Sequence, residues 1–487
     1  MKIAIFADLH YPAVPDPVKR AVLEWAVAAA RREKADRVVG AGDMISFGTA
    51  AEARRMREAL DRAGVPWLCT MGNAELRTPA ETAEVRRILA SAQEAPGVIL
   101  VESSGNALSA ADRARLDALP SGAGRLLVTH IPPATWPEAD RAVLNRARER
   151  GAVGAVIAGH VHCDGPETLR GLDPDKAAGG PPMLLFYECG EDGRWTRYER
   201  VMPGIAPEEW PDAARRKFRD GLGLALMYEP IAMLSFAIEN HIAAVELRGG
   251  TVREPDARLD ELLNDWRRAG GKILSLHLSE LAPAQDGAEA ELAATVRRAV
   301  ELGCQRVTLH VPRVGKCDYP AERDALLAQA GRVLAPLAEA GIAIGVENMH
   351  WKAGDTEETR RFGCTIEECR EWIALLRRTL PGATVGFHLD IGHARNNGVW
   401  GSRQPLGLWY AALGGELNGM HIHQVEQKAD GTFGNHRELT GFYDKLITLS
   451  GLFYAWNHGV IRQVPMFLEV LGTGGMASYS ALTGKLV

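Results

Sequence analysis

Residues 1–10, MKIAIFADLH, form a short apolar run that ends in Asp8 and His10. The same rhythm continues through the first 200 residues, where further apolar runs end in polar or glycine-rich motifs: RVVGAG at 37–42, WLCTMG at 67–72, RLLVTH at 125–130 and AVGAVIAGH at 152–160. Helical stretches are expected between them, near 17–33, 49–63, 79–91 and 137–150. Strands separated by helices of this length predict a layered α/β domain.

The polar residues that follow these runs form five motifs in order along the chain. They are Asp8-Leu-His10, Gly42-Asp43, Gly72-Asn73-Ala74-Glu75, His130 and Gly159-His160-Val-His162. Carboxylates, imidazoles and one amide at strand ends are the ligands that two divalent ions need when one carboxylate bridges them. A single such residue is an ordinary loop residue, but five motifs in this order indicate a metal centre.

This pattern resembles that of the calcineurin-like metallophosphoesterases. The resemblance implies that Asp43 bridges two ions and, with Asn73 and His130, serves catalysis. It assigns Asp8, His10 and His162 to one ion, and Asn73, His130 and His160 to the other. Mixed nitrogen and oxygen ligands do not select among Mn, Fe, Zn and Mg.

Ala74 departs from the family pattern, which has a histidine that contacts phosphate and protonates the leaving group. General acid catalysis contributes about 10²–10⁴-fold to a rate. We therefore expect a preference for good leaving groups, a substitute acid such as Glu75 or a group near His130, or weakened activity. A regulatory remnant domain is the alternative.

The second half repeats a different pattern, with eight strand-like runs between residues 223 and 470. They are GLALMY, HIAAVELRG, KILSLHLSE, RVTLHVP, IAIGVENMH, TVGFHLDIGH, LNGMHIHQ and PMFLEV. Helices are expected between most of them, near 256–269, 286–302, 320–340, 366–379 and 443–456. This predicts a (β/α)₈ TIM barrel. Because 204–220 is rich in proline and charge, we place a linker there, between domains at 1–203 and 221–487.

Barrel sites lie where the strands end, and seven of these strand ends carry acidic or imidazole side chains. The segment resembles the xylose-isomerase-like superfamily of TIM barrels. In its epimerase branch four residues hold one ion, which here implies Glu347, Asp390, His421 and Glu469. The two glutamates then also shuttle a proton beside a carbonyl. Glu246 and His423 are further strand-end residues for which a structural role is equally expected.

The endonuclease IV branch of that superfamily holds a cluster of three ions. It implies further ligands, for which this chain offers His277, His310, His393 and His436. The D-x-H motif expected after the seventh strand is Gly434-Asn435-His436 here, so a carboxylate is missing unless Asp430 replaces it. The barrel is therefore expected to bind one to three ions. Trp351, Lys352, Trp400, Arg313, Lys316 and the stretch RNNG at 395–398 are candidate substrate contacts.

Composition limits the partners. The 487 residues carry 56 Lys+Arg and 62 Asp+Glu, a net charge of −6, which supplies no global cationic field for a polyanion. Seven scattered cysteines argue against a disulfide scaffold. Neither a signal-peptide core nor a membrane span is expected, so a cytoplasmic enzyme is predicted; the oligomeric state stays open.

Together these features predict a bifunctional metal-dependent enzyme. Its first domain hydrolyses a phosphate mono- or diester, and its barrel isomerises or epimerises a sugar or sugar-phosphate-like substrate. A small phosphorylated substrate is thus the expected partner. The alternative is a nucleic-acid processing phosphodiesterase with a multinuclear barrel. The basic tract that such enzymes need is absent from this sequence. A ligand sensor with degenerate sites is a third interpretation.

Overall fold

The computed structural model describes residues 1–92, 94–252, 256–429 and 432–486, and they form two compact units. Unit 1 comprises Met1–Ala206 with Thr448–Leu452, and unit 2 comprises Pro207–Ile447 with Phe453–Val487. The segment predicted as a linker, 204–220, carries helix α6 (Asp212–Gly221), which belongs to unit 2. Phe218 on this helix is buried against Trp210, Phe453 and Trp456, with ring centroids 5.2–5.7 Å apart.

Unit 1 contains two sheets, as the predicted layered α/β fold requires. The first has the order β3 (Trp67–Thr70), β2 (Arg37–Ala41), β1 (Lys2–Phe6), β8 (Met183–Cys189) and β9 (Trp195–Val201). The second has the order β4 (Glu94–Ala95), β5 (Val98–Leu100), β6 (Arg125–Thr129) and β7 (Val153–Ala158). Side chains such as Ile5, Val39 and Leu126 join both sheets in one buried core. β8 and β9 pair antiparallel.

The helices of unit 1 begin where the sequence offers caps. Helix α1 (Pro17–Arg32) starts after Asp16, whose carboxylate accepts from two backbone N–H groups, and α2 (Ala50–Arg62) starts at a capping box of Thr49 and Glu52. The other helices are α3 (Thr82–Ile88), α4 (Ala110–Ala118) and α5 (Glu138–Glu149). Helix α4 is the one that our reading of the sequence missed.

Unit 2 is the predicted barrel, since its eight parallel strands close on themselves. In barrel order they are β10 (Leu222–Leu226), β11 (Ala244–Arg248), β12 (Ile273–His277), β13 (Arg306–His310), β14 (Ala343–Glu347), β15 (Val385–Asp390), β16 (Leu417–Ile422) and β19 (Met466–Leu468). Seven of the eight runs predicted from the sequence contain their strand, and the first covers all of β10 except Leu222. The α/β fold class, with a layered domain followed by a TIM barrel, is thus confirmed.

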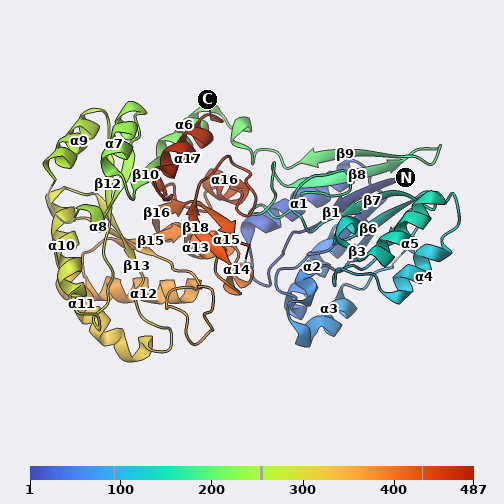
Figure 1. Ribbon diagram of the computed structural model, residues 1–487, viewed down its shortest axis with the longest axis horizontal. Helices are drawn as coiled ribbons and strands as arrows, with labels where there is room; N and C mark the ends of the chain where they lie inside the picture. Colours follow the sequence, from blue (N-terminus) through green and yellow to red (C-terminus); the bar gives the residue numbers. More distant parts are fainter. Residues whose placement is uncertain (93, 253–255, 430–431, 487) are drawn as a thin grey trace. The chain divides into compact units, whose positions relative to one another are not determined.

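Helices surround the barrel strands, as Figure 1 shows. They are α7 (Pro230–Glu239), α8 (Gly249–Val252), α9 (Ala257–Arg268), α10 (Ala288–Glu301), α11 (Tyr319–Glu339), α12 (Ile366–Thr379), α13 (Ile391–Arg395), α14 (Trp400–Arg403), α15 (Leu406–Leu413), α16 (Ser450–Asn457) and α17 (Gly474–Thr483). A hairpin of β17 (Gln424–Gln427) and β18 (Phe433–Arg437) follows β16. None of the described helices is long and apolar enough to cross a membrane.

Candidate metal centres

The strand ends of unit 1 carry the predicted ligands on unusual backbone. Five of these residues have a positive φ between 49° and 72°: Asp8, His10, Asp43, His160 and His162. Non-glycine residues rarely adopt this conformation, and where they do, the strain tends to mark a functional site. The turns direct these side chains toward one another instead of along the strands.

Glycines precede these ligands because no side chain fits there. A Cβ on Gly42 would lie 2.5 Å from the His130 ring, and one on Gly72 would lie 2.3 Å from an Asp43 oxygen. A Cβ on Gly159 would lie 2.8 Å from an Asp8 oxygen. The G-D, G-N and G-H motifs are therefore packing requirements of the cluster.

Asp43 lies between two histidines, each near a different carboxylate oxygen. Its Oδ2 is 3.7 Å from His10 Nε2, and its Oδ1 is 3.3 Å from His130 Nε2. The backbone N–H of Ala74 also donates to Oδ1, at 2.7 Å. This is the arrangement that a carboxylate bridging two cations requires.

The remaining predicted ligands of unit 1 complete the cluster. Asn73 Oδ1 lies 3.1 Å from His130 Nε2 and 3.0 Å from His160 Nδ1. Asp8 accepts from the His160 backbone N–H at 2.9 Å, and its Oδ1 lies 3.9 Å from His162 Nε2. Ligand atoms of Asp8, His10 and His162 all lie within 4.8 Å of one another. The structure thus brings together every residue predicted for this site.

Divalent cations fit this donor set. His10 is buried, and neither of its ring nitrogens has a hydrogen-bond partner among the described residues. Burial and the neighbouring Asp43 raise the pKa of Asp8 well above its usual value, while burial holds the pKa of His10 well below its own. Two carboxylates crowded beside neutral imidazoles form a site whose charge a cation would balance.

Glu75 supports the Asp43 loop. Its buried carboxylate accepts from the backbone N–H groups of Asp43, Ile45 and Gly72, at 2.6–3.1 Å. Burial and the charge of Asp43 raise its pKa to about 7. Because its oxygens are engaged by three amides, Glu75 is better placed to hold the loop than to protonate a leaving group.

The barrel holds a larger cluster at the carboxyl ends of its strands. Glu347, Asp390, His421 and Glu469 are buried, with ligand atoms within 4.8 Å of one another. His421 Nδ1 lies 3.2 Å from Glu347 Oε1 and 3.1 Å from Glu469 Oε2. These are the four residues predicted for a single ion.

A second group shares Glu347 with the first. Its other oxygen, Oε2, lies 3.2 Å from His277 Nε2 and 3.5 Å from His310 Nε2. Both His277 Nε2 and Glu347 Oε2 are buried without a hydrogen-bond partner among the described residues. His310 is oriented by Glu280, whose carboxylate is 2.9 Å from its Nδ1. Glu347 is thus placed to bridge two ions.

A third group consists of His393, His423 and His436, whose ligand atoms also lie within 4.8 Å of one another. His436 adopts a positive φ of 58°, and its backbone N–H donates to His423 Nδ1 at 3.0 Å. His423 Nε2 lies 3.0 Å from Asp390 Oδ1. His423 thus contacts both Asp390 and the His436 backbone. Gly434 supplies no carboxylate, and Asp430, the substitute considered above, lies outside the described residues.

Glu246 lies beneath the first group and orients it. Its Oε1 is 2.6 Å from His421 Nε2, and its Oε2 accepts from the hydroxyls of Ser275 and Thr308, each at 2.6 Å. Burial opposes protonation of His421, but the carboxylates of Glu469, Glu347 and Glu246 outweigh it and raise its pKa well above the usual value. With Nε2 bound to Glu246, His421 presents Nδ1 to the cluster.

Two buried residues of this network were missed from the sequence. Arg306 lies 3.4 Å from Glu246 Oε2 and 2.7 Å from His388 Nδ1. The signal was present, because side chains alternate along a strand. Arg306 lies two and four residues before Thr308 and His310, and His388 lies two before Asp390, so each shares the inward face.

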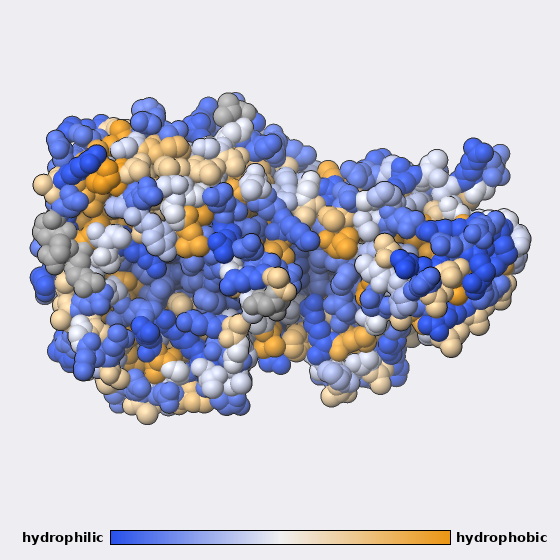
Figure 2. Space-filling model, in the orientation of Figure 1, coloured by the Kyte–Doolittle hydropathy of each residue, from blue (hydrophilic) through white to orange (hydrophobic). Residues whose placement is uncertain are grey.

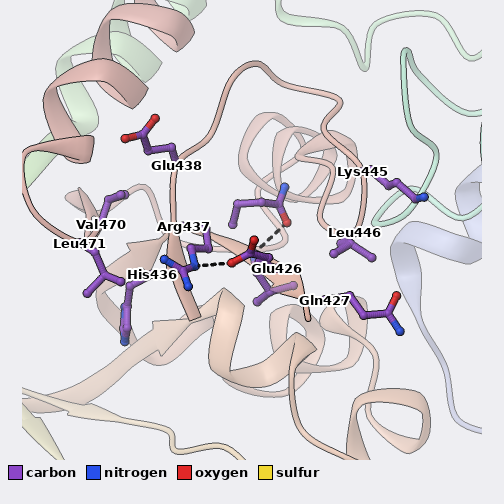
Figure 3. Close-up of a pocket in the computed structure, with 11 residues that line it drawn as sticks. Glu426, Gln427, His436, Arg437, Glu438, Lys445, Leu446, Val470 and Leu471 are labelled. Atoms are coloured by element: carbon purple, nitrogen blue, oxygen red, sulfur yellow. Dashed lines mark hydrogen bonds and ion pairs between the residues drawn. The ribbon is translucent and has the colours of Figure 1, made fainter. Parts of the chain in front are cut away.

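The candidate substrate contacts divide into two sets. Trp400 and Lys316 both contact Glu357, the former through Nε1 at 3.0 Å, and so stabilise a loop. Trp351 and Lys352 line a cavity beside the metal cluster. A further cavity of about 630 Å³ lies beside His436, where Glu426 and Arg437 form an ion pair across the hairpin at 2.9 Å (Figure 3).

Comparison with known proteins identifies both units. The model of the calcineurin-like phosphoesterases matches residues 1–164, and that of the xylose isomerase-like TIM barrels matches residues 242–444. No curated protein matches the chain significantly.

Three solved structures illustrate the likeness. A xylose isomerase domain protein from Alicyclobacillus acidocaldarius is 16% identical, with 53% of this chain and 95% of that chain covered and a TM-score of 0.38. A D-tagatose 3-epimerase-like protein is 16% identical, with 54% of this chain and 96% of that chain covered and a TM-score of 0.39. A dimetal phosphatase from Danio rerio is 17% identical, with 41% of this chain and 96% of that chain covered and a TM-score of 0.31.

Both matched families consist of enzymes, and each unit of this chain holds a cluster of metal-ligating side chains. The chain therefore carries a calcineurin-like phosphoesterase domain over residues 1–164 and a xylose isomerase-like TIM barrel over residues 242–444.

Proposed function

We propose that this chain is a bifunctional metal-dependent hydrolase whose first unit cleaves a phosphate mono- or diester. The position of Asp43, with one oxygen facing His10 at 3.7 Å and the other facing His130 at 3.3 Å, carries this proposal. Divalent ions bound there would neutralise phosphate charge and lower the pKa of water so that hydroxide forms near neutral pH.

The chain's own residues have distinct roles in that reaction. The backbone N–H of His160 donates to the Asp8 carboxylate, which fixes Asp8, at the end of the first strand, relative to the turn that carries His160. Asn73 links His130 and His160 through its carbonyl oxygen. Ala74 has no proton to give, so the leaving group departs as an anion. This favours aryl phosphates, whose leaving groups are the stronger acids, over alkyl phosphates.

For the barrel we propose hydrolysis of a phosphate ester at a multinuclear centre. Glu347 carries this assignment, because its two oxygens face two different donor groups. A single-ion isomerase has no evident use for His277 and His310 beside that carboxylate. Isomerisation or epimerisation of a sugar phosphate is the second candidate, favoured by the four-residue group of Glu347, Asp390, His421 and Glu469.

An aryl phosphodiester tests the first unit. With Mn²⁺-loaded full-length protein, Asp43→Asn should abolish its hydrolysis, while Asp390→Asn, a matched change in the barrel, should leave it largely intact. Hydrolysis that survives Asp43→Asn and disappears with Asp390→Asn would overturn the assignment to unit 1.

The barrel is tested in the Asp43→Asn background in D₂O. Release of phosphate from a nucleotide, lost on Asp390→Asn, supports hydrolysis. Incorporation of deuterium beside the carbonyl of a ketose phosphate, without phosphate release, would instead establish the isomerase candidate.

A further inference from the structure

We propose that the cavity between the loop after β14 and the β17–β18 hairpin binds a nucleobase, so that the barrel acts on a nucleotide. This inference rests on the proposed hydrolytic function and names its substrate class. The cavity has a volume of about 370 Å³, and its lining includes His350, Trp351, Lys352, Asn396 and Phe433.

The cavity adjoins the metal cluster. The His350 ring stacks on the His393 ring with centroids 4.6 Å apart, and His393 Nδ1 lies 3.5 Å from Glu347 Oε1. Two imidazole rings, those of His350 and His393, would therefore lie between a ligand in the cavity and the bridging carboxylate. Figure 2 shows largely hydrophilic side chains around the hollow in this face of the barrel, which suits a phosphorylated ligand.

Trp351 is a rigid wall of the cavity. Its indole packs on Gly398, where an added Cβ would lie 2.8 Å from the ring, and its Nε1 donates to the Asp355 carbonyl at 3.1 Å. Its backbone N–H donates to Asn397 Oδ1 at 3.0 Å. A ring held in this way loses little entropy when a planar ligand stacks on it.

Phe433 is an exposed aromatic at the same cavity. It is 37% exposed on the hairpin, which is held to the neighbouring loop by a hydrogen bond of 2.7 Å from Asn396 Nδ2 to Asn435 Oδ1. An exposed phenyl ring does not stabilise the fold, but two aromatic side chains at one cavity provide a surface for stacking a base, which is tolerant of base identity.

Polar groups for the edge of a base and for its phosphate are present as well. His350 Nδ1 is buried without a hydrogen-bond partner among the described residues. Asn396 donates one N–H to Asn435, which leaves its carbonyl oxygen able to accept from an exocyclic amine. Lys352 is exposed and supplies a positive charge. A simple sugar phosphate would use the cation but not the two aromatic rings.

The test compares adenosine monophosphate with ribose 5-phosphate, which lacks only the base. Both are used as phosphonate analogues, in which CH₂ replaces the ester oxygen, so that neither unit hydrolyses them. They are titrated calorimetrically into full-length Asp43→Asn protein loaded with Mn²⁺. Base stacking predicts that Phe433→Ala and Trp351→Ala each weaken adenosine monophosphate binding about 5- to 150-fold. Binding of ribose 5-phosphate should change less than twofold.

Tyr228→Ala is the matched control, since Tyr228 is 57% exposed on the barrel but does not line this cavity. It should leave both affinities unchanged. Equal affinity for the two ligands, or equal loss of both in the Phe433 variant, would overturn the subsite. If neither ligand binds, the subsite is refuted as well, whereas the metal content of the same protein reports separately on the proposed function.

Discussion

Glu246 provides a sharp test of how the barrel cluster is held, through the change Glu246→Gln. The buried carboxylate accepts from Ser275, Thr308 and His421 at 2.6 Å each and lies 3.4 Å from Arg306. Glutamine keeps the shape but removes the charge and turns one acceptor into a donor. Burial lowers the pKa of Arg306, which shows how poorly solvated that cation is.

The magnitude follows from these contacts. Removing one partner of a buried ion pair costs about 3–5 kcal/mol, and losing an outer hydrogen-bond partner of a ligating histidine weakens metal binding about 10–100-fold. Thr308→Val is the matched control, because it removes one neutral hydroxyl donor to the same carboxylate. Its expected cost is about 1 kcal/mol, with little change in metal affinity.

Two measurements on the full-length chain check this. Urea denaturation reports the stability of the barrel, and competition with a chromogenic chelator reports its metal affinity. The reasoning is refuted if Glu246→Gln binds metal within twofold of the native protein, or if Thr308→Val is as damaging as Glu246→Gln.

Three further predictions concern unit 1. Gly42→Ala should abolish phosphoesterase activity and remove metal from this unit only, because its Cβ would meet His130 at 2.5 Å and its φ is +85°; metal analysis of full-length protein decides. Because the Ala74 side chain offers no acidic proton, rates should fall steeply as the leaving-group pKa rises across aryl phosphates, and a flat dependence would contradict this. Burial and the charge of Asp173 raise the pKa of Asp175 to about 8. Between pH 3.8, the ordinary pKa of an aspartate, and pH 8, the folded protein therefore keeps a proton on Asp175 that the unfolded chain has released. Stability should then fall as pH rises from 4 to 8, and Asp175→Asn should raise Tm more at pH 8 than at pH 5.

Much of the fold was predictable because it is written in short-range patterns. Apolar runs of strand length separated by helical stretches located all eight barrel strands and the strands that carry the unit 1 motifs. Helix α4 escaped because its stretch, AADRARLDA, is short and mostly polar, and buries only Asp112 and Leu116. The β17–β18 hairpin was not predicted because its strands are largely polar, and Val425 is their single buried apolar residue.

The candidate sites were predictable only to the level of residue type. Strand ends converge in both folds, so Asp43 and Glu347 could be assigned without coordinates. Which imidazole nitrogen faces the cluster, and that Glu246 orients His421 instead of joining it, depends on distances across the barrel. His423 could not be distinguished from a core residue, because its role depends on the chain that brings His436 back to it.

The central claim is that both units hold ions and that Glu347 serves two groups. Its most direct test is the metal content of the full-length chain, purified, saturated with one divalent ion and freed of excess. The account predicts that Asp43→Asn loses two ions, both from unit 1, and that the barrel holds two or three. The double change His277→Ala, His310→Ala should remove one ion from the barrel, and Glu347→Gln should remove at least two. A barrel with a single ion that is indifferent to the His277 and His310 changes would contradict it and establish a one-ion site.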